Sequence, residues 1–185
     1  YLPTDSIRMH MFYAGASFGR RSGRHSDFAG EAARIARAVG NNVAVKLVWT
    51  REDDMRSGAY RPLNVHRLRG GLDGDGNVVA WQHRIVGQSI RGSGLGAAAS
   101  KDKIDNSGTE GAYNLPYPIP NLNVDVHQPY LDVPVLWWRS VGHTHTAFST
   151  ETFLDELAHA AGRDPYEFRL SMLADDPRRR AVLQQ

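Results

Sequence analysis

Hydrophobic and polar positions along this chain follow two different periods. Between residues 27 and 39, apolar side chains recur every three or four positions, which predicts an amphipathic helix. Asp27 is expected to be its N-cap, and Gly40 is expected to end it. The predicted apolar face consists of Phe28, Ala32, Ile35, Ala36 and Val39.

A period of two predicts strands. Residues 43–49 carry an apolar side chain at every second position and predict a half-buried strand. Residues 65–72 and 78–86 flank the Gly- and Asp-rich turn 73–77, which predicts an antiparallel hairpin. After a connection containing three prolines, residues 122–126 alternate again and predict another strand.

The last third of the chain returns to the helical period. One amphipathic helix is expected to end at Gly162, and Asp164 resembles the opening of a capping box for the next helix. These C-terminal helices are placed at residues 150–174. Strands precede most of the helices without regular strand–helix repeats, so we predict an α+β fold with a mixed or antiparallel sheet and packed helices.

Residues 87–111 are rich in Gly, Ala and Ser and show no clear apolar period. We interpret them as one long loop. Loops of this length inside a compact domain are often functional.

Composition excludes several classes of function. The 185 residues carry 22 basic and 20 acidic side chains, a balance that does not indicate a nucleic-acid or membrane surface. The chain has no cysteine, so it cannot itself supply a disulfide, a thiolate ligand or an iron–sulfur cluster. No apolar run reaches the length of a membrane span. The chain begins without Met or a signal peptide, so we expect a fragment, and its compartment is not indicated.

A first candidate site is the loop 15–21, Gly-Ala-Ser-Phe-Gly-Arg-Arg, which precedes the first predicted helix. Its small residues let backbone amides approach an anionic or ring-shaped ligand, and two arginines can neutralise charge. Taken alone, the segment also fits a Gly-rich turn followed by surface arginines.

A second candidate is the segment 133–146, which combines two tryptophans with Arg139, Ser140, a glycine and hydroxyl groups. Trp138 can form an apolar wall of a small-molecule pocket while the polar groups anchor the ligand. A buried strand end with a satisfied arginine is the alternative.

Other clusters indicate less chemistry. His143 and His145 lack a third ligand at compatible spacing, so we predict no metal site. Residues 73–84 imitate a calcium loop but fail at its sixth and twelfth positions. The acidic run 50–54 is interpreted as a charged strand-to-loop exit without a catalytic role. No Gly-x-Ser-x-Gly motif supports a hydrolase.

Three segments together resemble the molybdopterin-binding large subunit of the xanthine dehydrogenase and aldehyde oxidase family, most closely its isoquinoline 1-oxidoreductase β-subunit branch. They are residues 15–28, residues 45–55 with Val-Lys-Leu-Val-Trp-Thr-Arg-Glu-Asp-Asp-Met, and residues 137–158. The resemblance extends over nearly the whole chain. It implies that residues 1–185 are an internal fragment of a molybdopterin-binding domain, with a first cofactor loop at 15–21 and a second at 137–146.

The resemblance also assigns roles to residues. Trp138 is expected in the substrate pocket. The family's first loop usually reads Gly-Gly-Gly-Phe-Gly, and Ala16 and Ser17 depart from it. Arg21-Ser22 replace the Lys-Glu of purine-oxidising relatives, which argues against a xanthine-type substrate. The expected cofactor-binding residues are Gly15, Ala16, Ser17, Phe18, Gly19, Arg20, Arg139, Ser140, Val141, Gly142, His143 and Thr144.

For the complete enzyme, the resemblance implies oxidation of an aldehyde or N-heteroaromatic compound with water as the oxygen source. The implied cofactor is molybdopterin cytosine dinucleotide with molybdenum. The implied partners are the remainder of the large subunit, a small subunit holding [2Fe-2S], and an electron acceptor such as a cytochrome. The family's catalytic carboxylate lies in a Gly-Glu motif near the large subunit's C-terminus. Gly30-Glu31 lies in the first predicted helix instead, so we assign no catalytic residue here and expect no turnover by the fragment.

Two alternatives remain open from the sequence. One is a binding or assembly module that keeps the family fold without cofactor. The other is a sugar- or nucleotide-processing enzyme that binds phosphate with the glycine loop.

Overall fold

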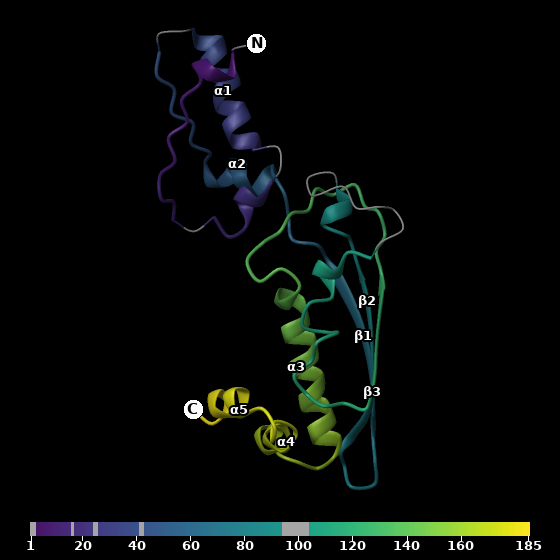
Figure 1. Ribbon diagram of the computed structural model, residues 1–185. Helices are drawn as coiled ribbons and strands as arrows, with labels where there is room; N and C mark the ends of the chain where they lie inside the picture. The colour runs from purple at the N-terminus through teal and green to yellow at the C-terminus, as the bar shows by residue number, and fades with distance from the viewer. Residues whose placement is uncertain (1–2, 16, 24–25, 41–42, 94–103) are drawn as a thin grey trace.

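The chain forms two parts that differ in how many of their residues are buried. The computed structural model describes residues 3–15, 17–23, 26–40, 43–93 and 104–185. Figure 1 shows an N-terminal part, residues 3–56, lying to one side of a unit built from a sheet and helices. We call residues 57–185 the sheet–helix unit.

Helix α1 spans Asp27–Val39, as predicted, and Gly40 ends it with a φ of 114°. The predicted N-cap is wrong by one residue, because Ser26 is the cap, with a φ of 41° and no side-chain capping bond. Asp27 instead occupies the first turn, where its negative charge interacts favourably with the helix dipole.

The strand predicted at residues 43–49 is not formed. These residues are extended, and Val45, Leu47 and Trp49 are more buried than their neighbours, so the predicted alternation is present. A strand needs a neighbour that accepts its N–H groups and donates to its C=O groups. Within the described residues this segment has no ladder partner.

The acidic run that we interpreted as a strand-to-loop exit is helix α2, Arg51–Arg56. Thr50 and Asp53 form a complete capping box, in which each side chain binds the other residue's backbone N–H. The interpretation was therefore wrong, and its acidic residues serve the first turn of a helix.

The sheet contains β1, Asn64–Leu72, β2, Val78–Gly87, and β3, Asn121–His127, in the order β1-β2-β3. Strands β1 and β2 form the predicted antiparallel hairpin, whereas β3 pairs parallel to β2. The sheet is mixed and has helices packed with it, which confirms the predicted α+β fold.

Three helices follow the sheet: α3, His143–Ala160, α4, Pro165–Met172, and α5, Pro177–Leu183. Helix α3 begins seven residues before the predicted 150, so the last four residues of the predicted second loop are helical. Helix α5 was not predicted. The segment 87–111 is less uniform than the predicted loop: Gly87 ends β2, residues 94–103 lie outside the described residues, and 3-10 turns occupy Arg91–Ser93 and Asn106–Gly108. Two further 3-10 turns span Thr4–Ser6 and Arg20–Ser22.

The core lies between the sheet and helices α3 and α4. Trp81 of β2 packs edge-on against Phe153 of α3, with ring centroids 4.8 Å apart. Leu154 and Phe168 are almost completely buried in the same cluster. This continuous core makes the sheet–helix unit a rigid support for the loop that precedes α3.

The N-terminal part has no buried residue among those described. On α1, Phe28 remains 41% exposed and Val39 54% exposed, although both belong to the predicted apolar face. No described helix has the length and apolar character needed to cross a membrane. The exposed large apolar side chains before α1 are Ile7, Met9, Met11, Phe12, Tyr13 and Phe18.

Candidate functional site

The two predicted cofactor loops contact each other directly. The backbone N–H of Arg139 donates a hydrogen bond of 2.7 Å to the carbonyl of Phe18. Gly19 has a φ of 105°, and a Cβ at this position would overlap the carbonyl of Trp137. Glycine is required here because of both the left-handed backbone and the close approach. We call this contact between the N-terminal part and the sheet–helix unit the joint.

The first loop is held by an ion pair within the N-terminal part. The guanidinium of Arg20 donates to both carboxylate oxygens of Asp27, at 2.9 and 2.6 Å. Hydrogen bonding to Arg20 lowers the pKa of Asp27, and the same bond raises the pKa of Arg20. Arg20 also lies 5.7 Å from the ring centroid of Trp49. Its charge is therefore already partnered, whereas Arg21 is exposed beside it.

A cavity of about 610 Å³, the joint cavity, lies between the first loop, α1, the extended segment before α2, and Trp138. Its walls combine aromatic faces with guanidinium groups, a chemistry that suits a flat ring carrying anionic groups. The Nε1–H of Trp138 is buried and has no acceptor among the described residues. The lining residues are Ser17, Phe18, Arg20, Arg21, Phe28, Ala29, Ala32, Leu47, Trp49, Arg51, Asp54 and Trp138.

The second loop contains unusual backbone. Ser140 has a φ of 72° and Val141 a φ of 41°. A positive φ is costly for a β-branched residue, and such conformations concentrate at functional sites. The next residue, Gly142, is the N-cap of α3, and a Cβ there would overlap the carbonyl of Ser107. Packing against the 106–108 turn therefore accounts for this glycine without a ligand.

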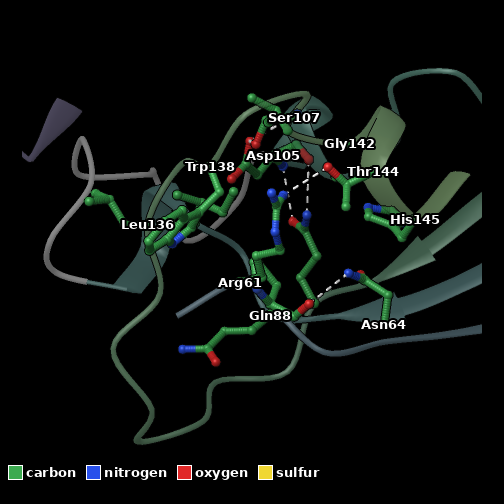
Figure 2. A pocket seen from close by; sticks show the side chains of 15 residues that line it. Arg61, Asn64, Gln88, Asp105, Ser107, Leu136, Trp138, Gly142, Thr144 and His145 are labelled. Carbon is green, nitrogen blue, oxygen red and sulfur yellow. Dashed lines mark hydrogen bonds between the residues drawn. The ribbon is translucent and has the colours of Figure 1, made fainter. Parts of the chain in front are cut away.

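Arg61, from the segment before β1, holds the second loop in shape. Its Nη1 donates to the carbonyl of Arg139 at 3.0 Å and to Oγ1 of Thr144 at 2.8 Å. Its guanidinium lies 5.9 Å from the ring centroid of Trp138. Figure 2 shows Arg61 extending between Trp138 and Thr144. These hydrogen bonds from one guanidinium hold the second loop in its conformation without a bound ligand.

A small cavity of about 50 Å³, the Arg61 cavity, lies on the α3 side of the second loop. It is too small for a ring cofactor and can admit a single polar group or water. Its lining residues, which Figure 2 draws as sticks, are Arg61, Pro62, Asn64, Gln88, Ile90, Asp105, Ser107, Gly108, Gln128, Leu136, Trp138, Val141, Gly142, Thr144 and His145.

An acidic side chain lies at the N-terminus of α3. Glu110 accepts a hydrogen bond of 3.2 Å from the backbone N–H of Gly142 and lies 3.7 Å from Nδ1 of His143. A carboxylate stabilises the unpaired N–H groups of a helix start. This end of α3 therefore already has an anionic partner within the chain.

Some of the predicted site residues line one of the two cavities, and others line neither. Trp138 contributes to both cavities. Ala16 lies outside the described residues. Ser17, Phe18 and Arg20 line the joint cavity, Val141, Gly142 and Thr144 line the Arg61 cavity, and neither is lined by Gly15, Gly19, Arg139, Ser140 or His143.

Arg139 is exposed, and within the described residues its guanidinium makes no hydrogen bond or ion pair, although its backbone ties the two loops together. The side chain is therefore available to an anionic ligand.

His143 and His145 lie in the first turn of α3 and point in different directions, because successive helical residues are rotated by about 100°. His143 is near Glu110, whereas His145 contacts His66. Within the described residues no group of three or more His, Asp or Glu side chains is arranged so that it could hold a metal ion.

Several residues at the site were not predicted. Arg61 and Glu110 act through contacts with residues far along the chain, so no local sequence signal identifies them. Trp49 was assigned to a strand, yet its Nε1–H donates to Glu31 at 2.9 Å and its ring lines the joint cavity. The tryptophans at positions 49 and 138, each close to an arginine in the sequence, were the signal that could have indicated the joint cavity.

Comparison with known proteins identifies the family. Residues 1–173 match the molybdopterin cofactor-binding domain. The chain is 28% identical over 180 residues to the isoquinoline 1-oxidoreductase subunit beta of Brevundimonas diminuta, covering 97% of this chain and 22% of that protein. It is 29% identical over 170 residues to the aldehyde oxidoreductase molybdenum-binding subunit PaoC of Escherichia coli K12, covering 91% and 21%.

A solved structure has the same fold. Quinoline 2-oxidoreductase from Pseudomonas putida 86 superposes with a TM-score of 0.63 at 20% identity, over 84% of this chain and 19% of that one. The chain thus spans about a fifth of the length of these relatives. With its match from residue 1 to 173, the chain belongs to the molybdopterin cofactor-binding domain family of xanthine dehydrogenase and aldehyde oxidase proteins.

Proposed function

We propose that the chain is part of a molybdenum hydroxylase large subunit that oxidises an aldehyde or an N-heteroaromatic compound with water as the oxygen source. In this proposal the joint binds one portion of molybdopterin cytosine dinucleotide. The observation that supports it best is the joint cavity of about 610 Å³, which is lined by Phe18 and two arginines of the first loop and by Trp138 of the second loop. Membership of the molybdopterin cofactor-binding domain family supports a molybdopterin cofactor, and its cytosine dinucleotide form is part of the proposal.

The chain's own residues would bind and orient the cofactor. Phe18 and Trp138 offer aromatic faces to a flat ring. Arg139 and Arg21 offer positive charge that other described side chains do not neutralise. When bound, the cofactor would supply the redox chemistry, and these residues would fix its position.

No carboxylate of the chain is proposed as the catalytic base. Glu31, in the chain's Gly-Glu pair, accepts the N–H of Trp49 at 2.9 Å, so its carboxylate is engaged in the N-terminal part. A general base must lie within hydrogen-bond reach of the proton that it removes. We therefore place the base in the remainder of the large subunit, and we expect residues 1–185 alone to show no turnover.

The proposed partners follow from the same family relation and from composition. The chain has no cysteine and cannot hold an iron–sulfur cluster. We propose that a small subunit holds [2Fe-2S] and passes electrons to an acceptor such as a cytochrome. The remainder of the large subunit would complete the cofactor site.

The direct test is analysis of the full-length protein purified with its small subunit. We expect molybdenum, a pterin and cytosine nucleotide released by mild hydrolysis. Reproducible absence of molybdenum would instead support a binding or assembly module without cofactor.

A Gly19→Ala variant tests the joint itself. The added Cβ collides with the Trp137 carbonyl, so cofactor content should be lost while the sheet–helix unit stays folded. Gly30→Ala is the control, because nothing lies within 4 Å of a Cβ on this helical residue. Equal cofactor content in both variants would contradict the proposed site.

An Arg139→Ala variant tests the exposed cation. It should reduce activity and cofactor content more than the yield of folded protein. Arg67→Ala, an exposed arginine of β1 outside both cavities, is the matched control. Equal losses of soluble protein and activity for Arg139→Ala would show that the residue supports the fold and not the ligand.

A further inference from the structure

Three histidines from three different elements form a continuous chain beside the second loop. Nδ1 of His66, on β1, lies 2.8 Å from Nε2 of His83, on β2. Nε2 of His66 lies 3.2 Å from Nδ1 of His145, in the first turn of α3. His66 thus uses both ring nitrogens, one toward each neighbour. We call the set the histidine chain.

The histidine chain is neutral at physiological pH. His83 is completely buried, and burial lowers its pKa to about 4. Burial also lowers the pKa of His145 to about 4 and shifts the pKa of His66 in the same direction. Asp125, on β3, opposes the shift at His83, but its carboxylate is paired with Arg84 at 2.5 Å. Burial therefore favours the neutral form of all three rings.

A neutral imidazole has one N–H donor and one bare nitrogen acceptor. Because His66 sits between two rings, the chain of hydrogen bonds must run in a single direction. If it ran from His145 to His83, the remaining proton would lie on Nδ1 of His83. That atom is buried and has no partner among the described residues, and an orphaned buried N–H is rare in folded proteins.

The opposite direction avoids this cost. Nε2–H of His83 then donates to Nδ1 of His66, and Nε2–H of His66 donates to Nδ1 of His145. The bare acceptor left on His83 is better tolerated than an orphaned donor. The proton of His145 must then lie on its Nε2.

The outer end of the histidine chain is open to a ligand. Nε2 of His145 is not among the buried unpartnered atoms of the described residues, and the His145 ring lines the Arg61 cavity. In Figure 2, His145 lies beside Thr144, on the side of the cavity away from Trp138. The cavity can admit one polar group, and both the Arg61 guanidinium and the Asp105 carboxylate, which lies 3.6 Å from Arg91, line it.

We infer that His66 and His83 are positioning residues, which fix His145 as an Nε2–H donor for a carbonyl or phosphate oxygen entering the Arg61 cavity. This inference rests on the proposed function in taking that oxygen to belong to the bound cofactor. The direction of the histidine chain itself is independent of the cofactor. The statement about the histidine tautomers and the statement about the ligand can therefore be contradicted independently.

The first experiment measures the tautomer through chemical reactivity. Diethyl pyrocarbonate acylates an accessible imidazole nitrogen that carries no proton. In the cofactor-free full-length protein at pH 7, we expect His145 to react about tenfold more slowly than His143, because both of its nitrogens are engaged or protonated. Peptide mass spectrometry reads both residues from one peptide, and His143 is the internal control. Equal rates would overturn the inference.

Variants of His83, at the buried end of the histidine chain, test whether slow labelling of His145 comes from its tautomer or only from its burial. His83→Gln keeps an amide donor near the place of Nε2, so slow labelling of His145 should persist. His83→Leu removes the donor, His66 becomes free to change tautomer, and labelling of His145 should rise toward the rate of His143. Neither substitution removes an atom that is hydrogen-bonded to His145. Identical labelling in the two variants, with thermal unfolding showing both folded, would contradict the positioning role.

The ligand part is tested in the loaded protein. His145→Gln retains a donor and should keep the pterin, whereas His145→Leu should release it about fivefold faster, as expected for the loss of one neutral hydrogen bond. His159→Leu, at an exposed position in the last turn of the same helix, is the control. If the wild-type protein lacks pterin, the proposed function fails while the labelling result stands. If both His145 variants retain pterin equally, the donor role fails.

Discussion

The N-terminal part and the sheet–helix unit contrast in what holds them together. The sheet–helix unit has a continuous core around Trp81, Leu154 and Phe168. The N-terminal part has an amphipathic helix and an alternating extended segment, yet no described residue of it is buried. Its secondary structure is supported by local devices such as the α2 capping box and the Arg20–Asp27 pair.

This difference in burial indicates that the two parts have different structural roles. A helix gains most of its stability from packing its apolar face, and exposed apolar area on this scale usually marks an interface. The sheet–helix unit fixes the second loop, whereas the N-terminal part presents the first loop and leaves large apolar side chains exposed. The joint cavity lies where the two parts meet.

The largest effect should come from the core of the sheet–helix unit. Phe168→Ala removes a side chain that is 1% exposed and should reduce the free energy of unfolding by about 3–5 kcal/mol. Phe28→Ala, on α1, removes a side chain that is 41% exposed and should change it little. Urea unfolding of both variants measures the contrast. A similar loss for Phe28→Ala would show that the N-terminal part has a core of its own.

A smaller loss is expected where α4 is tied to α3. Arg169 donates to Glu151 at 2.9 Å and to Asp155 at 2.6 Å, and its side chain is 12% exposed. Because both carboxylates are substantially exposed, Arg169→Met should cost about 1–2 kcal/mol. Arg84→Met, which breaks an exposed pair on the sheet, is the control. An equal effect of the two substitutions on thermal stability would show that the half-buried Arg169 pairs stabilise the fold no more than the exposed Arg84 pair.

Acid should destabilise the sheet–helix unit before the N-terminal part. The pKa of His83 is about 4 in the folded protein, against an ordinary value of 6.5. Its neutral form therefore contributes fully to the free energy of unfolding above pH 6.5, and this contribution is lost as the pH falls toward 4. At pH 5 the loss should be about 1–2 kcal/mol for this group. His83→Gln should flatten the dependence, whereas His10→Gln, at an exposed position before α1, should leave it unchanged. Unfolding at pH 7 and pH 5 provides the measurement.

The smallest effect is expected for Asp27→Asn. Its pair with Arg20 is partly exposed, so stability at neutral pH should change by less than about 1 kcal/mol. The lowered pKa of Asp27 means that the pair contributes above the ordinary value of 3.8 and is lost as the pH falls further. Wild type and variant should therefore converge in strong acid. A large loss at pH 7 would make this pair a central support of the N-terminal part.

Local signals predicted the parts of the fold that depend on neighbours in sequence. Helix α1 and the β1–β2 hairpin lie where the apolar periods and the turn at Asp73 placed them. Asp164 accepts from the N–H groups of Tyr166 and Glu167, as a predicted cap should. In each case the stabilising contact lies within a few residues of the signal.

The errors arise from contacts between distant residues. Residues 43–49 alternate like a strand, but hydrogen-bonding partners decide whether a strand forms, and periodicity cannot identify them. The start of α3 was misplaced because Gly142 resembled part of a loop, whereas its close approach to Ser107 requires glycine at a helix N-cap. Thr50-x-x-Asp53 was a visible capping signal for α2 and was overlooked.

The candidate site was predicted as two loops, and its geometry as a joint was not. Phe18 and Trp138 could be selected from glycine and aromatic content, but Arg61 could not, since its role depends on reaching Arg139 and Thr144. The histidine chain likewise unites β1, β2 and α3. Such groupings are set by tertiary structure alone.

The hydrogen bond between Arg139 and Phe18 also has a kinetic consequence. It closes a chain segment of about 120 residues, and the entropy lost on closing so long a loop is about 4 kcal/mol, far more than one hydrogen bond returns. The hairpin and α3 must therefore form before the joint, since they shorten the path that remains to be closed. The joint should be the last feature to assemble and the first to exchange its amide protons, so a cofactor arriving there would bind a nearly finished protein and complete its folding.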